Sequence, residues 1–323
     1  MIYHREPPKD LIRTLANSPA NEPLFNKDYL TEEELYYPNM KTVYDNFSSY
    51  FNIPQNNFIL TSGTEESLRI TISSIKDKYR DYDINFYYES PSWGMPSPIM
   101  NSMNDYVCPL NYIMDGYEFT LNIPPSKYDS SINVIYVSNW FSNVLFHKNS
   151  FIGINSDDRK NNIYIVDDIY TLFAFHFPYR NCLNDKVIYI GSFSKAISPG
   201  YRLGYIVYDS IYNKYMQTYR PLYVNLLAAK MINSLINKDS KYIKILEKFN
   251  RMVRDCISQN EEFRKLGHLD TIHPNYLTFE KDGFLYNKYK DRLEPNKEFT
   301  ISGKKFLRTG QRDLIDRIIY FGN

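Results

Sequence analysis

Between residues 58 and 208, short β-rich apolar runs alternate with helical segments, and this pattern limits the possible folds more than any other feature. Helices are predicted over 41–52, over 64–80, which opens with the favourable N-terminal turn Thr64-Glu65-Glu66, and over 94–104. The apolar runs are FILT (58–61), INFYY (84–88), VIYV (134–137), IYIV (163–166), VIYIG (187–191) and YIVY (205–208). Strands that alternate with helices predict an α/β domain with a mostly parallel central sheet and helices on both faces.

The pattern changes after about residue 209. Residues 211–237 and 240–265 are predicted to form long helices, YLTF (276–279) and FTI (299–301) to form short strands, and a closing helix is predicted from about Asp313. This indicates a smaller α+β domain. We therefore expect an N-terminal arm (1–40) that packs with the small domain or a partner subunit, a large domain (41–238) and a small C-terminal domain (239–323).

Composition excludes several classes of protein. A net charge of +1 over 323 residues argues against a chain that coats nucleic acid or a membrane surface. The three cysteines, Cys108, Cys182 and Cys256, are far apart and form no CxxC pair, so neither a disulfide framework nor a zinc site is expected. No apolar run approaches the ~18 residues that span a bilayer, and the N-terminus has no signal-like apolar region. We expect a cytoplasmic protein.

The segment YIGSFSKAISPGYRLGYIV (189–207) carries the strongest chemical signal. It places Lys195 just after a buried strand, in a turn with two hydroxyl groups, and an arginine follows seven residues later. A lysine in this position can form a Schiff base, Ser192 and Ser194 can bind phosphate oxygens, and Arg202 can bind the phosphate with two N–H groups. The alternative is a surface turn with a solvated lysine and an ion-paired arginine.

S-x-S-K followed by P-G-x-R-x-G resembles the cofactor-lysine segment of fold-type-I pyridoxal-phosphate (PLP) enzymes, in particular the class I and II aminotransferases. The Y-P stretch, the T-S-G-T loop and the compact length look most similar to the histidinol-phosphate aminotransferase branch. The resemblance implies the aspartate-aminotransferase-like fold, pyridoxal 5′-phosphate as cofactor, a Schiff base at Lys195, and phosphate ligands at Ser192, Ser194 and Arg202.

Two upstream segments follow in the family's order. In ILTSGTEESL (59–68), a helix begins after Ser62-Gly63-Thr64, and the N–H groups of a helix N-terminus attract anions. Such a tripeptide is by itself more often a simple helix cap, but the resemblance implies that these three residues cradle the PLP phosphate. In ESPSWGMP (89–96), the resemblance implies that Trp93 stacks on the cofactor ring; the alternative is a core tryptophan.

IYIVDDIYTLF (163–173) places two acids at the end of a buried strand, where they are costly unless they are paired. The family pattern D-x-x-Y implies that Asp167 binds the pyridine nitrogen and that Tyr170 donates to the 3′-oxygen of the cofactor. Asp168 occupies a position where relatives commonly carry Glu. A metal-binding pair of aspartates is the rival interpretation, but no His or Glu lies nearby in the sequence, so we expect no metal.

The resemblance alone implies roles for one arginine and one tyrosine. KKFLRTGQRD (304–313) resembles the stretch whose arginine grips the substrate carboxylate, which implies Arg308. A plain surface arginine is the alternative. YYPNMK resembles the stretch whose tyrosine reaches the phosphate of the neighbouring subunit, which implies Tyr37 and a homodimer.

One loop departs from the family. Relatives carry N-P-x-N-P-T-G where this chain has SNWFSNVLFH (138–147). Gapless alignment puts Ser142 in place of the asparagine that binds the 3′-oxygen, with Asn143 one residue further on; we take Asn143 as the candidate. The departure puts ordinary transamination more in doubt than PLP binding.

The sequence therefore predicts a PLP-dependent aminotransferase that acts on small amino and keto substrates, with no nucleic-acid or membrane partner. Two alternatives stay open. One is a PLP-dependent decarboxylase or lyase of the same fold. The other is a binding protein that has kept the fold and lost the activity, which the altered 138–147 loop motivates.

Overall fold

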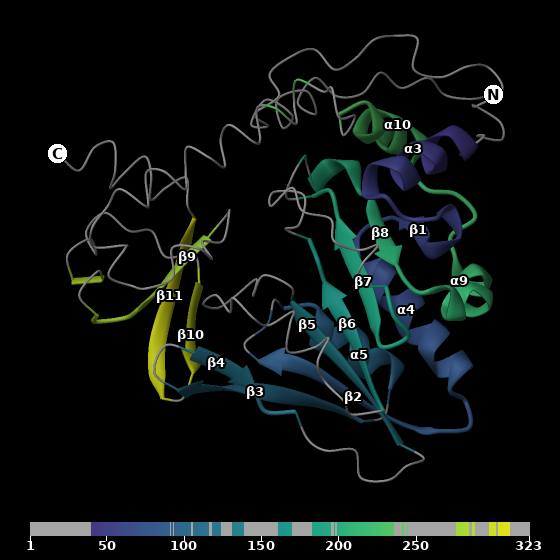
Figure 1. Cartoon of the computed structure of the whole chain (residues 1–323). Helices are drawn as coiled ribbons and strands as arrows, with labels where there is room; N and C mark the ends of the chain where they lie inside the picture. Colours follow the sequence, from purple (N-terminus) through teal and green to yellow (C-terminus); the bar gives the residue numbers. More distant parts are fainter. Residues whose placement is uncertain are drawn as a thin grey trace, which may run out of the picture.

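In the computed structural model of the chain, a mostly parallel sheet lies between helices (Figure 1). The structure describes residues 40–90, 92, 94–104, 106–115, 118–123, 131–138, 161–169, 183–194, 197, 199–235, 241, 244, 276–283, 286–287, 297–301 and 303–310. The expected arm (1–40) lies outside these residues except for Met40. So do most of the expected 240–265 helix, the closing helix and the junction at 238–239 between the two expected domains.

The main sheet has eight strands in the order β1-β8-β7-β6-β5-β2-β3-β4. Their bounds are β1 (Phe58–Thr61), β2 (Asp83–Ser90), β3 (Val107–Asp115), β4 (Glu118–Leu121), β5 (Ser131–Ser138), β6 (Asn162–Asp167), β7 (Val187–Ser192) and β8 (Gly204–Val207). The strands β3, β2, β5, β6 and β7 pair in parallel. Since β8 is antiparallel to both β7 and β1, the strand β1 runs in the same direction as β7. The predicted mostly parallel α/β sheet is confirmed.

Helices cover both faces of this sheet. One face packs against α3 (Lys41–Phe51) and α10 (Leu226–Leu235), and the other packs against α4 (Thr64–Lys78), α5 (Pro96–Met103) and α9 (Asn213–Tyr219). The strands β5, β6 and β7 are buried along their whole length, which is why their sequences are almost continuously apolar. Among the described residues, no helix has the length and hydropathy to cross a membrane.

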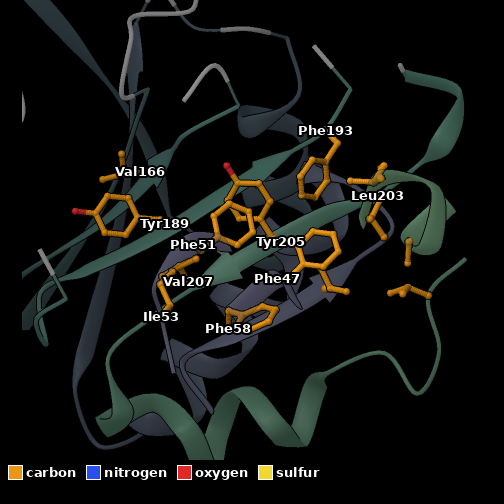
Figure 2. Close-up of a cluster of buried hydrophobic side chains, with 14 of the residues drawn as sticks. Phe47, Phe51, Ile53, Phe58, Val166, Tyr189, Phe193, Leu203, Tyr205 and Val207 are labelled. Carbon is orange, nitrogen blue, oxygen red and sulfur yellow. The ribbon is translucent and has the colours of Figure 1, made fainter. Parts of the chain in front are cut away.

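An aromatic cluster fixes α3 on β1, β7 and β8 (Figure 2). Phe193 lies edge-on to Phe47 at 5.4 Å between ring centroids and packs against Tyr205 at 5.5 Å. Phe51 lies 5.3 Å from Tyr205. Edge-to-face and tilted pairs of this kind add to the stabilisation from burial itself. Phe193 belongs to the turn before Lys195, so the cluster anchors the end of β7 and the start of this turn.

The single long helix expected over 211–237 is wrong. The structure has a 3₁₀ turn (Ser210–Tyr212), then α9, and α10 begins only at Leu226. Pro221 has no N–H group and disfavours the helical conformation of the residue before it. Arg220 accordingly has extended backbone angles, with φ −58° and ψ 145°, and ends α9.

A second sheet has three antiparallel strands in the order β10-β11-β9. It consists of β9 (Tyr276–Glu280), β10 (Lys297–Ile301) and β11 (Lys304–Gly310), which confirms the two strands predicted there and adds β11. The strands β3 and β4 were not predicted either. Pro109 and Asn111 interrupt the apolar pattern of β3, so its sequence lacks the usual strand signature.

Three glycines allow β8 to pack tightly between β1 and β7. A Cβ on Gly204 would lie 2.7 Å from the Cα of Gly63, 2.7 Å from the Oγ1 of Thr61 and 2.8 Å from the carbonyl oxygen of Gly191. Two of these three atoms belong to the backbone, which cannot move aside as a flexible side chain can. Gly204 therefore sets how closely the ends of the three strands approach each other.

We expect Gly204→Ala to lower the free energy of unfolding by about 1–3 kcal/mol, because the added methyl group overpacks three strands at once. Gly94→Ala is the matched control, since a Cβ at Gly94 would meet no atom within 4 Å. Urea denaturation of both variants measures the difference. Equal stability of the two variants would contradict the close packing at Gly204.

Candidate active site

The candidate residues that the structure describes gather at one edge of the main sheet. Parallel strands end at the same edge, and binding sites of open α/β sheets lie there. Asp167 ends β6 and Ser192 ends β7. Arg202 precedes β8, which begins at this edge because it is antiparallel, and Thr61 of β1 pairs with Gly204 of β8. The fold thus brings together segments that are more than a hundred residues apart.

The backbone of Gly63 and the side chain of Arg202 lie side by side where α4 begins, and we call this pair the Gly63–Arg202 cradle. Gly63 has a φ of 123°, and a Cβ there would lie 3.1 Å from Nη2 of Arg202. The guanidinium group of Arg202 therefore lies directly beside the Gly63 backbone. Arg202 itself has a φ of 48°, a left-handed conformation that costs roughly 1 kcal/mol for a residue with a side chain. Such strained residues are found at functional sites.

The start of α4 offers donors to an anion. The hydroxyl oxygen of Thr64 is buried and has no hydrogen-bond partner in the described part of the chain. The first N–H groups of a helix have no carbonyl partner within it and carry partial positive charge. The N–H of Ser62 is already used, because it donates to the carboxylate of Glu66 at 2.6 Å. An unpartnered buried hydroxyl, a helix N-terminus and an arginine fit a phosphate group.

The turn after β7 orders the two serines. Ser192 is buried, and its hydroxyl oxygen accepts a hydrogen bond from the backbone N–H of Ser194 at 3.1 Å. Ser194 is half-buried. This bond closes the turn immediately before Lys195, a residue that lies outside the described part of the chain.

Hydrogen-bond donors from β5 and from the turn after β6 contact the carboxylate of Asp167, which is only 4% exposed. The hydroxyl of Tyr136 donates to Oδ2 at 2.5 Å, and the N–H of Ile169 donates to Oδ1 at 3.2 Å. Hydrogen bonds to an ionised group are stronger than neutral ones. Sequence reasoning missed Tyr136, since a tyrosine within the apolar run VIYV resembles a simple core residue.

Asp168, the neighbouring acid, is tied to the sheet through its backbone. Its N–H donates to the carbonyl oxygen of Ile190 at 2.6 Å, and its own carbonyl oxygen accepts from the hydroxyl of Tyr205 at 3.3 Å. Burial, together with the charges of Asp168 and Asp167, holds the pKa of Tyr205 well above its ordinary value. Tyr205 therefore stays a neutral donor. These bonds join the end of β6 to β7 and β8.

Glu89 is a third buried acid at this edge, beside Asp167 and Asp168, and it was also missed from the sequence. It lies near the end of β2, 1% exposed, and both of its carboxylate oxygens accept hydrogen bonds, one from Ser138 and one from Tyr112. Burial raises the pKa of Glu89 to about 7, against the opposing effect of these bonds, and the charge of Asp167 raises it further.

The structure does not describe the other predicted site residues. Arg308 lies on β11, where it pairs with Lys297 and Thr278, but its side chain lies outside the description. Six further candidates lie entirely outside the described residues, and their roles stay predictions: Tyr37, Trp93, Ser142, Asn143, Tyr170 and Lys195. Among the described residues, no group of three His, Cys, Asp or Glu side chains could hold a metal ion.

The raised pKa of Glu89 gives the protein a pH-dependent stability. The folded state keeps the proton of Glu89 up to about pH 7, whereas the unfolded chain loses it near the ordinary value of 4.5. Stability therefore falls as pH rises between these two values. We expect the wild-type protein to lose about 2 kcal/mol between pH 5.5 and 8 relative to Glu89→Gln.

Urea denaturation at both pH values measures this difference, with Asp81→Asn as the control because Asp81 is exposed in the turn before β2. Parallel pH profiles for the wild-type protein and Glu89→Gln would mean that Glu89 does not titrate in this range.

Residues 155–280 match the family model for aminotransferase class I and II. No curated protein sequence matches the chain at a significant level.

Solved structures with this fold include enzymes of several activities. The histidinol-phosphate aminotransferase from Clostridium acetobutylicum has a TM-score of 0.57 at 15% identity, over 86% of this chain and 87% of that one. The L-threonine-O-3-phosphate decarboxylase from Porphyromonas gingivalis has a TM-score of 0.58 at 15% identity, over 88% and 90%. The PLP-bound C-S lyase from Staphylococcus hominis has a TM-score of 0.56 at 15% identity, over 82% and 78%. The chain thus has the aspartate-aminotransferase-like fold, PLP fold type I, and its residues 155–280 match the class I and II aminotransferase family.

Proposed function

We propose that the protein is a PLP-dependent aminotransferase, which moves an amino group between an amino acid or amino-phosphate compound and a keto substrate. Pyridoxal 5′-phosphate is the cofactor that the family match and the fold imply. When bound, it supplies an electron sink for the negative charge that develops on the substrate, provided that its ring nitrogen is protonated. Lys195 is proposed to carry it through a Schiff base.

The observation that carries the proposal is the arrangement of Asp167 and the Gly63–Arg202 cradle on one sheet edge. Asp167 is buried and accepts hydrogen bonds from Tyr136 and from the N–H of Ile169, so its carboxylate is suited to a cationic partner such as a protonated ring nitrogen. The cradle, the buried Thr64 hydroxyl and the helix N-terminus suit a phosphate group. PLP carries these two groups on one small molecule.

Lys195 follows the turn that Ser192 and Ser194 close. We propose that the amine of Lys195 serves as the base that takes a proton from the substrate and as the acid that returns it. The remaining roles come from the sequence resemblance, and we carry them as part of the proposal: ring stacking by Trp93, donation to the 3′-oxygen by Tyr170 and Asn143, and a grip on the substrate carboxylate by Arg308.

The proposal also includes a homodimer that works in the cytoplasm. The support is the Y-P stretch, which implies that Tyr37 reaches the phosphate bound by the partner subunit, and the three dispersed cysteines. Small amino and keto compounds would be the substrates.

A PLP-dependent decarboxylase or lyase is the second candidate. The altered 138–147 loop favours it, and enzymes that bear those names share the fold. The same residues would bind the cofactor, but the substrate would be oriented so that a different bond at its α-carbon breaks. Fold alone does not decide between these outcomes.

The absorption spectrum of the purified protein with PLP tests the cofactor assignment. We expect a band near the visible edge in the wild-type protein that disappears with borohydride, no such band in Lys195→Ala, and an unchanged band in Lys214→Ala, since Lys214 is exposed on α9. Keto products from amino substrates support transamination, whereas amine and CO2 support decarboxylation. A wild-type protein that stays colourless with excess PLP would overturn the enzyme assignment in favour of a non-catalytic binding protein.

Tyr136→Phe tests the role of Asp167. Removing the hydroxyl takes away a donor that holds the carboxylate, so we expect PLP to bind roughly tenfold more weakly. Tyr189→Phe is the control, because Tyr189 lies in the hydrophobic cluster on the opposite face of the sheet from Tyr136 (Figure 2). Spectroscopic titration with PLP gives both dissociation constants. Equal affinity in the two variants would argue against the contact between Tyr136 and Asp167.

A further inference from the structure

Glu89 joins β2 to both of its neighbouring strands, β5 and β3. It lies on β2, one of its oxygens accepts from the Ser138 hydroxyl of β5, and the other accepts from the Tyr112 hydroxyl of β3 at 2.5 Å. The backbone of Ser138 adds a further hydrogen bond to the same carboxyl group. Burying a carboxyl group costs free energy, and the donors that surround Glu89 offset part of that cost.

The strand β5 connects Glu89 to the proposed cofactor site. Ser138 ends β5 and lies opposite Asp167 in the parallel register with β6. Tyr136, two residues earlier on β5, donates to the Asp167 carboxylate. Whatever fixes the end of β5 therefore also fixes the donor that holds Asp167.

We propose that Glu89 is a positioning residue of the proposed cofactor site: with Ser138 and Tyr112 it clamps the end of β5, and the clamp is complete only when Glu89 is ionised. This inference rests on the proposed function, because it assigns Glu89 to the site that would hold the PLP ring nitrogen.

The ionisation of Glu89 matters for the clamp because the groups that contact its carboxyl group, among the described residues, are all hydrogen-bond donors. An ionised carboxylate only accepts hydrogen bonds, and it matches the Ser138 hydroxyl, the Ser138 backbone and the Tyr112 hydroxyl. A protonated carboxyl group carries its own O–H, which needs an acceptor, so one of the two hydroxyl groups must turn away. The end of β5 is then held by fewer bonds.

This change falls near neutral pH. Burial raises the pKa of Glu89 to about 7; the groups that act on it within the described part of the chain are Ser138 from β5, Tyr112 from β3 and Asp167 from β6. The charge on ionised Glu89 also favours a protonated ring nitrogen at Asp167. Both effects favour cofactor binding above pH 7.

The test measures the dissociation constant for PLP between pH 5.5 and 8.5 in the wild-type protein and in Glu89→Gln. The ionisations of PLP and of Lys195 contribute to both curves, so the ratio of the two constants isolates Glu89. We expect the wild-type protein to gain about fivefold in affinity relative to Glu89→Gln as pH rises through 7, the effect of one recovered hydrogen bond. Asp81→Asn should follow the wild-type curve.

Tyr112→Phe provides a second test, which stands even if Glu89→Gln fails to fold. Removing the hydroxyl takes away a donor that lowers the pKa of Glu89, so the midpoint of the affinity change should move to higher pH. A merely structural role would weaken binding equally at every pH and leave the midpoint in place.

Three outcomes are distinct. A pH-dependent ratio with a shifted midpoint in Tyr112→Phe supports the clamp. Normal PLP binding with a constant ratio and an unmoved midpoint overturns the clamp and leaves the proposed function intact. Absence of PLP binding to the wild-type protein at any pH overturns both.

Discussion

The burial of the parallel strands β5, β6 and β7 between two layers of helices is the constraint on which the rest of the structure depends. Their side chains are shielded from water on both faces, and the aromatic cluster of Phe47, Phe51, Phe193 and Tyr205 attaches α3 to them. Dry packing on this scale fixes the strand register. The register in turn fixes which residues meet at the carboxyl ends of the strands, where the chain passes from core to solvent.

Polar groups at such an edge occupy a partly dry environment, and this gives them their chemical character. Asp167 and Glu89 are both almost completely buried, yet each is surrounded by hydrogen-bond donors. A low dielectric strengthens those bonds and at the same time penalises charge. Burial, with a smaller contribution from the charge of Asp167, raises the pKa of Glu89 to about 7. The hydrogen bonds that Asp167 accepts suit a cationic ligand. Environments that differ in this way allow neighbouring carboxyl groups to take different roles.

The part of the site that would hold the phosphate depends on glycine residues. Gly63, Gly191 and Gly204 allow β1, β8 and β7 to approach closely, and the space beside Gly63 accommodates the guanidinium group of Arg202. The close approach at Gly204 and the unusual backbone of Arg202 lie within a few residues of each other. The tight packing of the strands and the cradle for an anion are thus consequences of the same contacts.

The sequence by itself determined the alternation of strands and helices, the parallel sheet and the segments that carry Lys195, Asp167 and Arg202, because these features are local patterns of apolar, glycine and polar residues. The end of α9 was also predictable from the sequence, because Pro221 disfavours a helical conformation at Arg220. Only the tertiary structure revealed Tyr136 and Glu89. Tyr136 meets Asp167 across 31 residues, and Glu89 meets Ser138 across 49. In the sequence each is an unremarkable residue of a strand, and it gains a role only because strand pairing brings distant donors and acceptors into contact in a buried place where they must be satisfied.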